Sequence, residues 1–191
     1  MARIALPLGF PHVLAFKQNR GKGTVLLEGF RHAVEHYKDS IIITMDSDCQ
    51  HHAVDIPHIA QGIHEGNDLV MGTRLFKIMP FKSRFANIII SMLLRRQFPH
   101  APNDSQTGFR GLTTQFAAEL LEQLTAGHYE VEFHMLLYAL HMNKHIRSVP
   151  ISTIYINKNA SSHFSAIKDS VKILKVFYIH LYVKYLNQKK I

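Results

Sequence analysis

The sequence contains very little cysteine. Cys49 is the only one among 191 residues, so the chain can form neither an internal disulfide framework nor a thiolate zinc cluster. No apolar run is long enough to cross a bilayer, and we expect no integral membrane segment. The first ten residues are broken by proline and glycine and do not resemble a secretory signal peptide. Internal repeats and low-complexity linkers are also absent.

Positive charge, in contrast, is abundant. The formal net charge is +8 with histidine neutral, while the hydrophobic fraction of 47% and the charged fraction of 19% are ordinary for a soluble α/β domain. The basic excess suits nucleic acid, phosphorylated substrates or an anionic lipid surface, and it is also compatible with a solvated basic surface that has no partner. Because no RNA- or DNA-binding motif accompanies the charge, we expect no nucleic-acid partner.

Helical and strand patterns alternate along the chain. They predict a helix after the glycine-rich turn at 19–24, a strand at 41–45, a helix from Pro57 to His64, a strand at 68–71, helices at 82–98, 114–125 and 131–143, and a strand at 148–155. The run Ile41–Met45 is typical of a strand buried on both faces of a parallel sheet. This order of elements indicates an α/β sandwich with a mostly parallel sheet.

Two of the expected elements have a distinct apolar side. The helix at 82–98 carries Phe85, Ile88, Ile89, Met92 and Leu93 on one side. The tail at 168–191 places apolar residues along one helical face and lysines mostly opposite. Such a basic amphipathic helix can lie in a membrane interface, or it can pack on its own domain.

Two aspartates follow the strand expected at 41–45. Ligands of open parallel α/β sheets bind at the carboxyl ends of strands, and the carboxylates of Asp46 and Asp48 can point into one cleft there. Two hard oxygen ligands suit Mg²⁺ or Mn²⁺, which would bridge to a diphosphate, and Gln50 would add a neutral oxygen ligand. Acidic pairs after strands are also often caps or solvated turns.

A wider set of motifs occurs along the chain in a fixed order. They are Asn19-Arg-Gly-Lys-Gly23, Asp46-Ser-Asp-Cys-Gln-His51, Gly72-Thr-Arg74, Asp104-Ser-Gln-Thr-Gly-Phe-Arg110, Val149-Pro-Ile151 and Ser161-Ser-His-Phe164. This set resembles the family 2 glycosyltransferases with the GT-A fold, and most of all the polyprenol-phosphate branch that includes dolichol-phosphate mannose synthase. Each motif is modest alone, but together and in order they are specific.

The resemblance implies a role for each motif. Lys22 and Gly23 would approach the donor phosphates; Asp46, Asp48 and Gln50 would hold the metal and the donor diphosphate; Arg74 and Arg84 would neutralise the acceptor phosphate; Asp104 and Arg110 would shape the acceptor side. An acceptor phosphate would attack the anomeric carbon directly, with inversion and without a strong base. An alcohol acceptor would need a base, for which Asp104 is the first candidate.

Several of these residues also have a simpler, purely structural interpretation. Arg84 can pair with a surface carboxylate, Asp104 can cap a helix, and Lys22 can be a solvated turn residue. Adjacent His51 and His52 point apart on an extended chain, so we do not assign them as ligands. The acidic pair at 130 and 132 resembles one in the family, but a helix dipole also favours carboxylates at that place.

The resemblance fails at the start of the chain. The family begins with a β-α-β unit that recognises the nucleotide, and residues 1–16 do not match it. We therefore expect an N-terminally truncated GT-A domain at 1–167 and an amphipathic helix at 168–191, with the missing strands absent or supplied by a partner chain. Cys49 replaces a glycine or small residue, which is tolerable if the backbone there avoids positive φ.

Two functions follow from these expectations. The first is metal-dependent, inverting transfer of a sugar from a UDP- or GDP-linked donor to a polyprenol phosphate or another lipid-linked acceptor, at the cytoplasmic face of a membrane. The alternative is a catalytically inactive glycosyltransferase remnant that serves as a binding or interaction module.

Overall fold

The computed structural model describes residues 13–79, 81–124, 130–154, 175 and 177–178. The elements are α2 (Lys22–His36), β1 (Ile41–Thr44), η1 (Ala53–Asp55), α3 (Ile56–His64), β2 (Leu69–Thr73), η2 (Phe76–Ile78), α4 (Phe81–Gln97), β3 (Arg110–Thr113), α5 (Thr114–Gln123), α6 (Glu130–His141) and β4 (Ile146–Pro150). Each helix and strand expected between residues 19 and 155 is present, with small shifts of its ends. Most of the helix expected at 168–191, and all of 161–164, lie outside the described residues.

The sheet has four strands in the order β1-β3-β2-β4. β2 and β4 are parallel, whereas β3 runs antiparallel to both of its neighbours. The α/β fold is confirmed, but the expectation of a mostly parallel sheet is wrong for β3. The chain returns from α4 to the end of the sheet at which β2 finished, where the Gly72 N–H donates to the Phe109 carbonyl at 2.9 Å. β3 therefore starts at that end and runs back.

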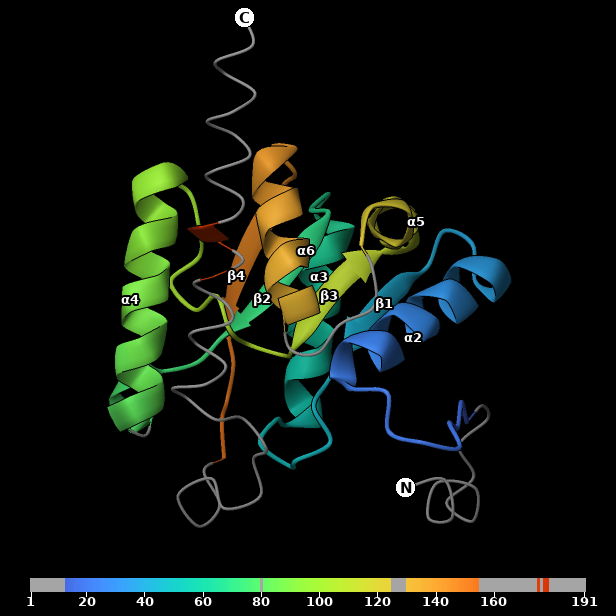
Figure 1. Cartoon of the computed structure of the whole chain (residues 1–191), viewed down its shortest axis with the longest axis horizontal. Coiled ribbons are helices and arrows are strands. Elements are labelled where there is room, and N and C mark those ends of the chain that lie inside the picture. The colour runs from blue at the N-terminus through green and yellow to red at the C-terminus, as the bar shows by residue number, and fades with distance from the viewer. Residues whose placement is uncertain (1–12, 80, 125–129, 155–174, 176, 179–191) are drawn as a thin grey trace, which may run out of the picture.

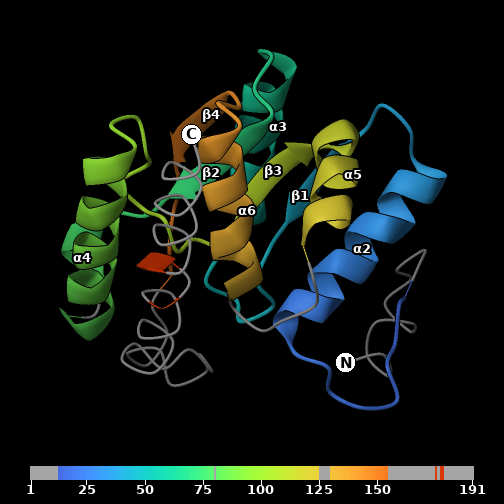
Figure 2. The same ribbon diagram turned by 45° about the horizontal axis from the view of Figure 1, so that its top comes forward.

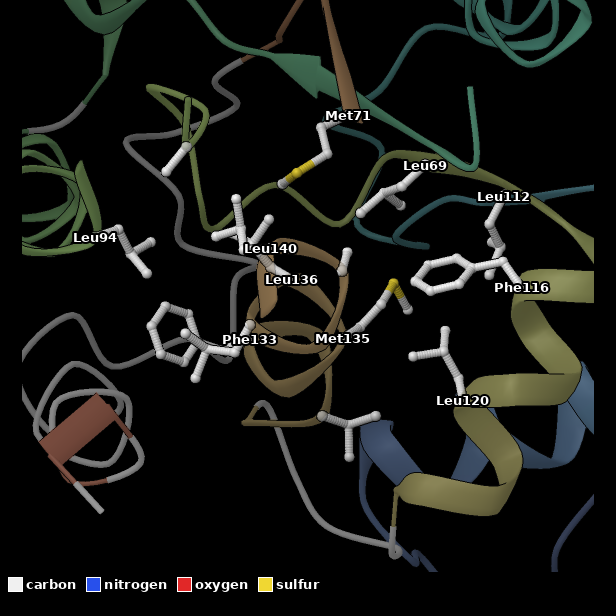
Figure 3. Close-up of a cluster of buried hydrophobic side chains, with 14 of the residues drawn as sticks. Leu69, Met71, Leu94, Leu112, Phe116, Leu120, Phe133, Met135, Leu136 and Leu140 are labelled. Carbon is white, nitrogen blue, oxygen red and sulfur yellow. The ribbon is translucent and has the colours of Figure 1, made fainter. Parts of the chain in front are cut away.

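Helices cover both faces of the sheet (Figures 1 and 2). The larger core lies between the sheet and α6, where Leu69, Met71 and Leu112 meet the buried side of that helix (Figure 3). On the opposite face Val70 packs with Ile59 of α3. The alternation of neighbouring β2 residues between the two cores is the two-residue period of a strand that is buried on both faces.

β1 is less enclosed than expected. All four of its residues are half-buried, and it pairs with antiparallel β3 along one edge. No strand of the described part of the chain lies along its other edge. The expected strand is present at Ile41–Thr44. The expectation that it is fully buried within a parallel sheet is wrong, because it is half-buried and its paired neighbour is antiparallel.

α4 packs with a different side from the one that its apolar residues indicate. An apolar side normally faces the core, but Phe85, Ile88 and Met92 are exposed. The buried positions are instead Asn87, Ile90, Ser91 and Leu94. Two of those four are polar, and hydrogen bonds described below explain their burial.

None of the described helices is both long and apolar enough to span a bilayer.

Candidate active site

Three charged side chains from separate elements meet beside the end of β1. The Lys22 ammonium group lies 2.6 Å from Asp46 Oδ1 and 2.9 Å from Glu132 Oε2. Lys22 opens α2, Asp46 follows β1, and Glu132 lies in the first turn of α6. Glu132 Oε1 is buried and has no hydrogen-bond partner among the described residues. Two carboxylates thus share one ammonium group in a largely enclosed place.

The electrostatic surroundings keep Asp46 and Lys22 charged. Burial by itself would raise the pKa of Asp46, but the nearby His51 ring and the Lys22 ammonium outweigh burial and hold that pKa well below its usual range. Burial would lower the pKa of Lys22, but Glu132 and Asp46 raise it above its usual value. Asp46 is therefore a carboxylate at neutral pH, and it already attracts a cation.

The backbone at the start of α2 presents N–H groups beside the same cluster. Gly21 adopts a φ of 82°, in the left-handed region that glycine tolerates best, and its N–H donates to Asn19 Oδ1 at 2.9 Å. No side chain caps the helix at Gly21. The first N–H groups of a helix are a common binding place for anions, and here they belong to Lys22 and Gly23.

The turn after β1 is held by its own side chains. Asp48 Oδ1 accepts a hydrogen bond from the Gln50 N–H at 3.2 Å. Gln50 is buried, so it is the least accessible of the three predicted metal ligands. Cys49 has a φ of 62°, so the condition under which a cysteine is readily tolerated here, a backbone without positive φ, is not met. A non-glycine residue in that region costs roughly 1 kcal/mol, which the surrounding turn must offset.

Gly108 makes room for the Asp46 carboxylate. A Cβ atom added at Gly108 would lie 2.2 Å from Asp46 Oδ2, far closer than any real contact allows. The Gly108 carbonyl also accepts a hydrogen bond from Thr44 Oγ1 at 3.0 Å. The glycine of the Asp104–Arg110 motif is thus needed where this loop crosses the end of β1.

Arg74 and Asp104 form a second cluster at the end of β2. Arg74 donates from Nε to Asp104 Oδ2 at 2.7 Å and from Nη2 to Oδ1 at 2.9 Å, and its backbone N–H donates at 3.1 Å. Asn87 of α4 donates to Asp104 Oδ1 at 2.7 Å. Burial would raise the pKa of Asp104, but Arg74 outweighs burial and lowers it. The Asp104 carboxylate is fully buried and surrounded by donors, so it suits holding Arg74 and does not fit the role of a general base.

Arg110 is a structural residue rather than a ligand contact. Its side chain is 1% exposed, and its guanidinium donates to the carbonyl groups of Glu132 at 2.6 Å, Thr107 at 2.9 Å and Ser105 at 3.2 Å. Burial lowers the pKa of Arg110. This geometry ties the loop before β3 to α6, and it does not fit the expected direct role of Arg110 in binding a ligand on the acceptor side.

The other residues considered in the sequence, Arg84, His51 and His52, differ in how exposed their side chains are. Arg84 is exposed on α4. The side chain of His51 is buried, with its Nε2 3.8 Å from Asp46 Oδ2 and its ring 5.1 Å from that of Phe109, whereas His52 is exposed. The two histidines therefore point apart, as expected for adjacent residues.

Sequence reasoning did not assign Asn87, Gly108 and Glu132 to a site. The acidic pair at the start of α6 was the available signal for Glu132, but the helix dipole explained it equally well. Gly108 stood within a recognised motif without a role of its own. Asn87 had no signal, because only its contact with Asp104 distinguishes it from a surface asparagine.

The residues present fit a divalent metal that is shared with a ligand. Within the described part of the chain, no group of three or more His, Cys, Asp or Glu side chains could hold an ion. Mg²⁺ typically binds proteins through one or two carboxylates together with substrate phosphates. Asp46 and Asp48 are hard oxygen donors of this kind, so they suit a metal completed by a diphosphate rather than a closed protein cage.

Comparison with known proteins decides the family. The sequence model of glycosyl transferase family 2 matches residues 5–124, which is more than half of the chain. The chain belongs to glycosyl transferase family 2. It is similar to two uncharacterized proteins of Methanocaldococcus jannaschii: MJ1222, at 32% identity over 149 residues, and MJ0544, at 27% over 117 residues. These matches cover 75% and 57% of this chain but only 61% and 51% of the relatives, so this family 2 chain spans little more than half of their length.

Solved structures of a glucosyl-3-phosphoglycerate synthase have a similar fold. Glucosyl-3-phosphoglycerate synthase from Mycobacterium tuberculosis, in complex with phosphoglyceric acid, has a TM-score of 0.59 at 19% identity, over 83% of this chain and 55% of that chain. The same synthase in complex with Mn²⁺ and UDP-glucose has a TM-score of 0.52 at 20% identity, over 76% and 50%. At such identities the likeness establishes the fold, and the predicted GT-A-like fold is confirmed.

Proposed function

We propose that this family 2 chain transfers a sugar from a nucleotide-sugar donor with the help of a divalent metal. The observation that carries the proposal is the Lys22 ammonium group 2.6 Å from Asp46, at the point where the start of α2 meets the end of β1. Cationic groups, helix N–H groups and metal-binding carboxylates are what a nucleoside diphosphate requires. The Mycobacterium tuberculosis synthase, which has the same fold, is bound to Mn²⁺ and UDP-glucose in its crystal structure.

On the donor side, Asp46 and Asp48 would hold Mg²⁺ or Mn²⁺ together with a UDP or GDP diphosphate. When bound, the metal neutralises charge on the departing diphosphate. Lys22 adds a second positive charge, and the N–H groups at the start of α2 receive the phosphate oxygens. Glu132 holds the Lys22 ammonium from the other side at 2.9 Å, so that the lysine is positioned before the donor arrives.

On the acceptor side, we propose a phosphate-bearing substrate. Asp104 holds the Arg74 guanidinium at two points, and such a planar group suits a phosphate. Arg84 would supply further positive charge from α4. A phosphate oxygen is a sufficient nucleophile for inverting attack without a base, in keeping with the burial of Asp104. A polyprenol phosphate or another lipid-linked phosphate is the acceptor class that the motifs favour, with the chain peripheral at the cytoplasmic face of a membrane.

A partner chain, or a further segment, would complete the sheet in this proposal. The outer edge of β1 carries unpaired backbone groups among the described residues, and exposed edges accept additional strands. The relatives are longer than this chain. If nothing fills that edge, the alternative of an inactive remnant that acts as an interaction module applies.

Isothermal titration of the whole chain with UDP and with GDP, in the presence and absence of Mn²⁺, tests the proposal. We expect binding of one nucleotide that requires Mn²⁺ and is lost in Asp48→Ala. Glu122→Ala, at an exposed carboxylate of α5, is the matched control and should bind like the wild type. If neither nucleotide binds in the presence of Mn²⁺, the remnant alternative replaces sugar transfer.

A further inference from the structure

α4 exposes a continuous apolar stripe to solvent. Phe81, Phe85, Ile88 and Met92 are 79%, 57%, 41% and 63% exposed. Their spacing of three or four residues places them along one side of the helix. The rings of Phe81 and Phe85 stack with their centroids 6.3 Å apart. Contiguous exposed apolar residues of this kind mark an interaction surface.

The buried side of α4 prevents the helix from turning this stripe inward. Asn87 Nδ2 donates to Asp104 Oδ1 at 2.7 Å, and Ser91 Oγ donates to the Asn103 carbonyl at 2.6 Å. Rotation of the helix would break both bonds and leave the Asp104 carboxylate buried with fewer donors, which is unfavourable for a buried charged group. The stripe is therefore held outward by hydrogen bonds on the opposite side.

Positive charge borders the stripe. Arg84, Arg95 and Arg96 are exposed, and at 100° per residue Arg84 and Arg95 lie along one border and Arg96 along the other. Residues 81–97 contain no Asp or Glu. The surface complementary to α4 is thus apolar along its centre and anionic at its edges.

We propose that the α4 stripe docks this chain on an anionic lipid bilayer. Helices with aromatic and aliphatic residues on one face and Arg at its borders lie in the plane of the membrane interface, where anionic headgroups attract the cations. The inference rests on the lipid-linked acceptor of the proposed function and adds a means of reaching it. Through Asn87, the docked helix contacts the Asp104 that holds Arg74, so the acceptor side lies next to the docking helix.

Co-sedimentation of the whole chain with vesicles tests the docking. The vesicles are phosphatidylcholine alone, or phosphatidylcholine with about a third phosphatidylglycerol. We expect the wild type to bind the anionic vesicles. The double variant Phe85→Ser, Met92→Ser should bind about tenfold more weakly, because two apolar side chains no longer leave water. Val54→Ser, at an apolar residue that is 66% exposed on η1, is the matched control and should bind as the wild type does.

A charge variant tests whether the arginines at the borders of the stripe attract anionic headgroups. Arg96→Gln should weaken binding to anionic vesicles about fivefold, whereas Lys38→Gln, at another exposed cation, should leave it unchanged. Urea unfolding of each variant establishes that the fold is retained.

Several results would overturn the docking. They are equal binding of the wild type to neutral and anionic vesicles, undiminished binding of the double variant, and self-association through the stripe in place of vesicle binding. Because no nucleotide takes part, docking and donor binding are measured separately, and each can fail without the other.

Discussion

Arg74 and Asp104 form a two-point ion pair between the end of β2 and the loop before β3, with N–O distances of 2.7 and 2.9 Å. Asp104 is fully buried, and the Arg74 side chain is 17% exposed. Removing one partner of a buried pair leaves the other charge without compensation. We therefore expect Asp104→Asn to lower the free energy of unfolding by about 3 kcal/mol in urea titrations.

The control is Glu119→Gln, in the more exposed pair with Lys144, which should change the free energy of unfolding by no more than about 1 kcal/mol. Similar losses for the two variants would contradict the structural role of Asp104.

The depressed carboxyl pKa values predict how stability depends on acid. Asp46 and Asp104 have pKa values in the folded protein below the value of about 3.9 for an unfolded aspartate. Such groups contribute stability that is fully present above the unfolded pKa and is lost as the pH falls through the folded value. Urea unfolding at pH steps between about 2 and 6 should show the free energy of unfolding falling below about pH 4, with a shallower fall for Asp104→Asn. Parallel curves for the variant and the wild type would show that Asp104 does not contribute.

Gly108 is predicted to control the orientation of Asp46. A methyl group at this position would collide with the carboxylate, so Gly108→Ala should displace Asp46 and abolish Mn²⁺-dependent nucleotide binding. The cost in unfolding free energy should be only about 1–3 kcal/mol, as in other overpacked sites. Gly29→Ala in α2 meets no atom within 4 Å, and it should raise stability by up to about 1 kcal/mol without changing nucleotide binding. Unaltered nucleotide affinity in Gly108→Ala would separate Asp46 from the donor site.

Lys22 is predicted to have opposite effects on metal alone and on metal with nucleotide. Its ammonium group occupies the neighbourhood of Asp46 and competes with a second cation there. In Lys22→Gln, Mn²⁺ alone should bind roughly fivefold more tightly, because the competing charge is gone, while the nucleotide should bind more weakly. Lys38→Gln removes the charge of an exposed lysine, and its titrations with the same ligands show the effect of losing one positive charge elsewhere on the chain. Weaker binding of both ligands in Lys22→Gln would mean that the lysine only maintains the local structure.

Local sequence was sufficient for the helices, for β1, β2 and β4, and for one side of the site. The apolar run at 41–45 predicted β1, and the turn at 19–24 predicted the start of α2, because both depend on residues that are neighbours in the chain. The Asp-x-Asp pair after β1 and the glycine-rich turn before α2 then indicated a phosphate site. The family resemblance rests on the same short motifs.

Only the tertiary structure decided which partners these residues have. The sequence by itself determined the positions of the helices and of three of the four described strands, because propensity and periodicity act over a few residues. It did not predict β3 at Arg110–Thr113. It did not determine the reverse direction of β3, the pairing of Lys22 with Glu132, or the burial of Asn87 in place of Phe85. Those outcomes depend on hydrogen bonds and ion pairs between segments far apart in the chain, which no local pattern records.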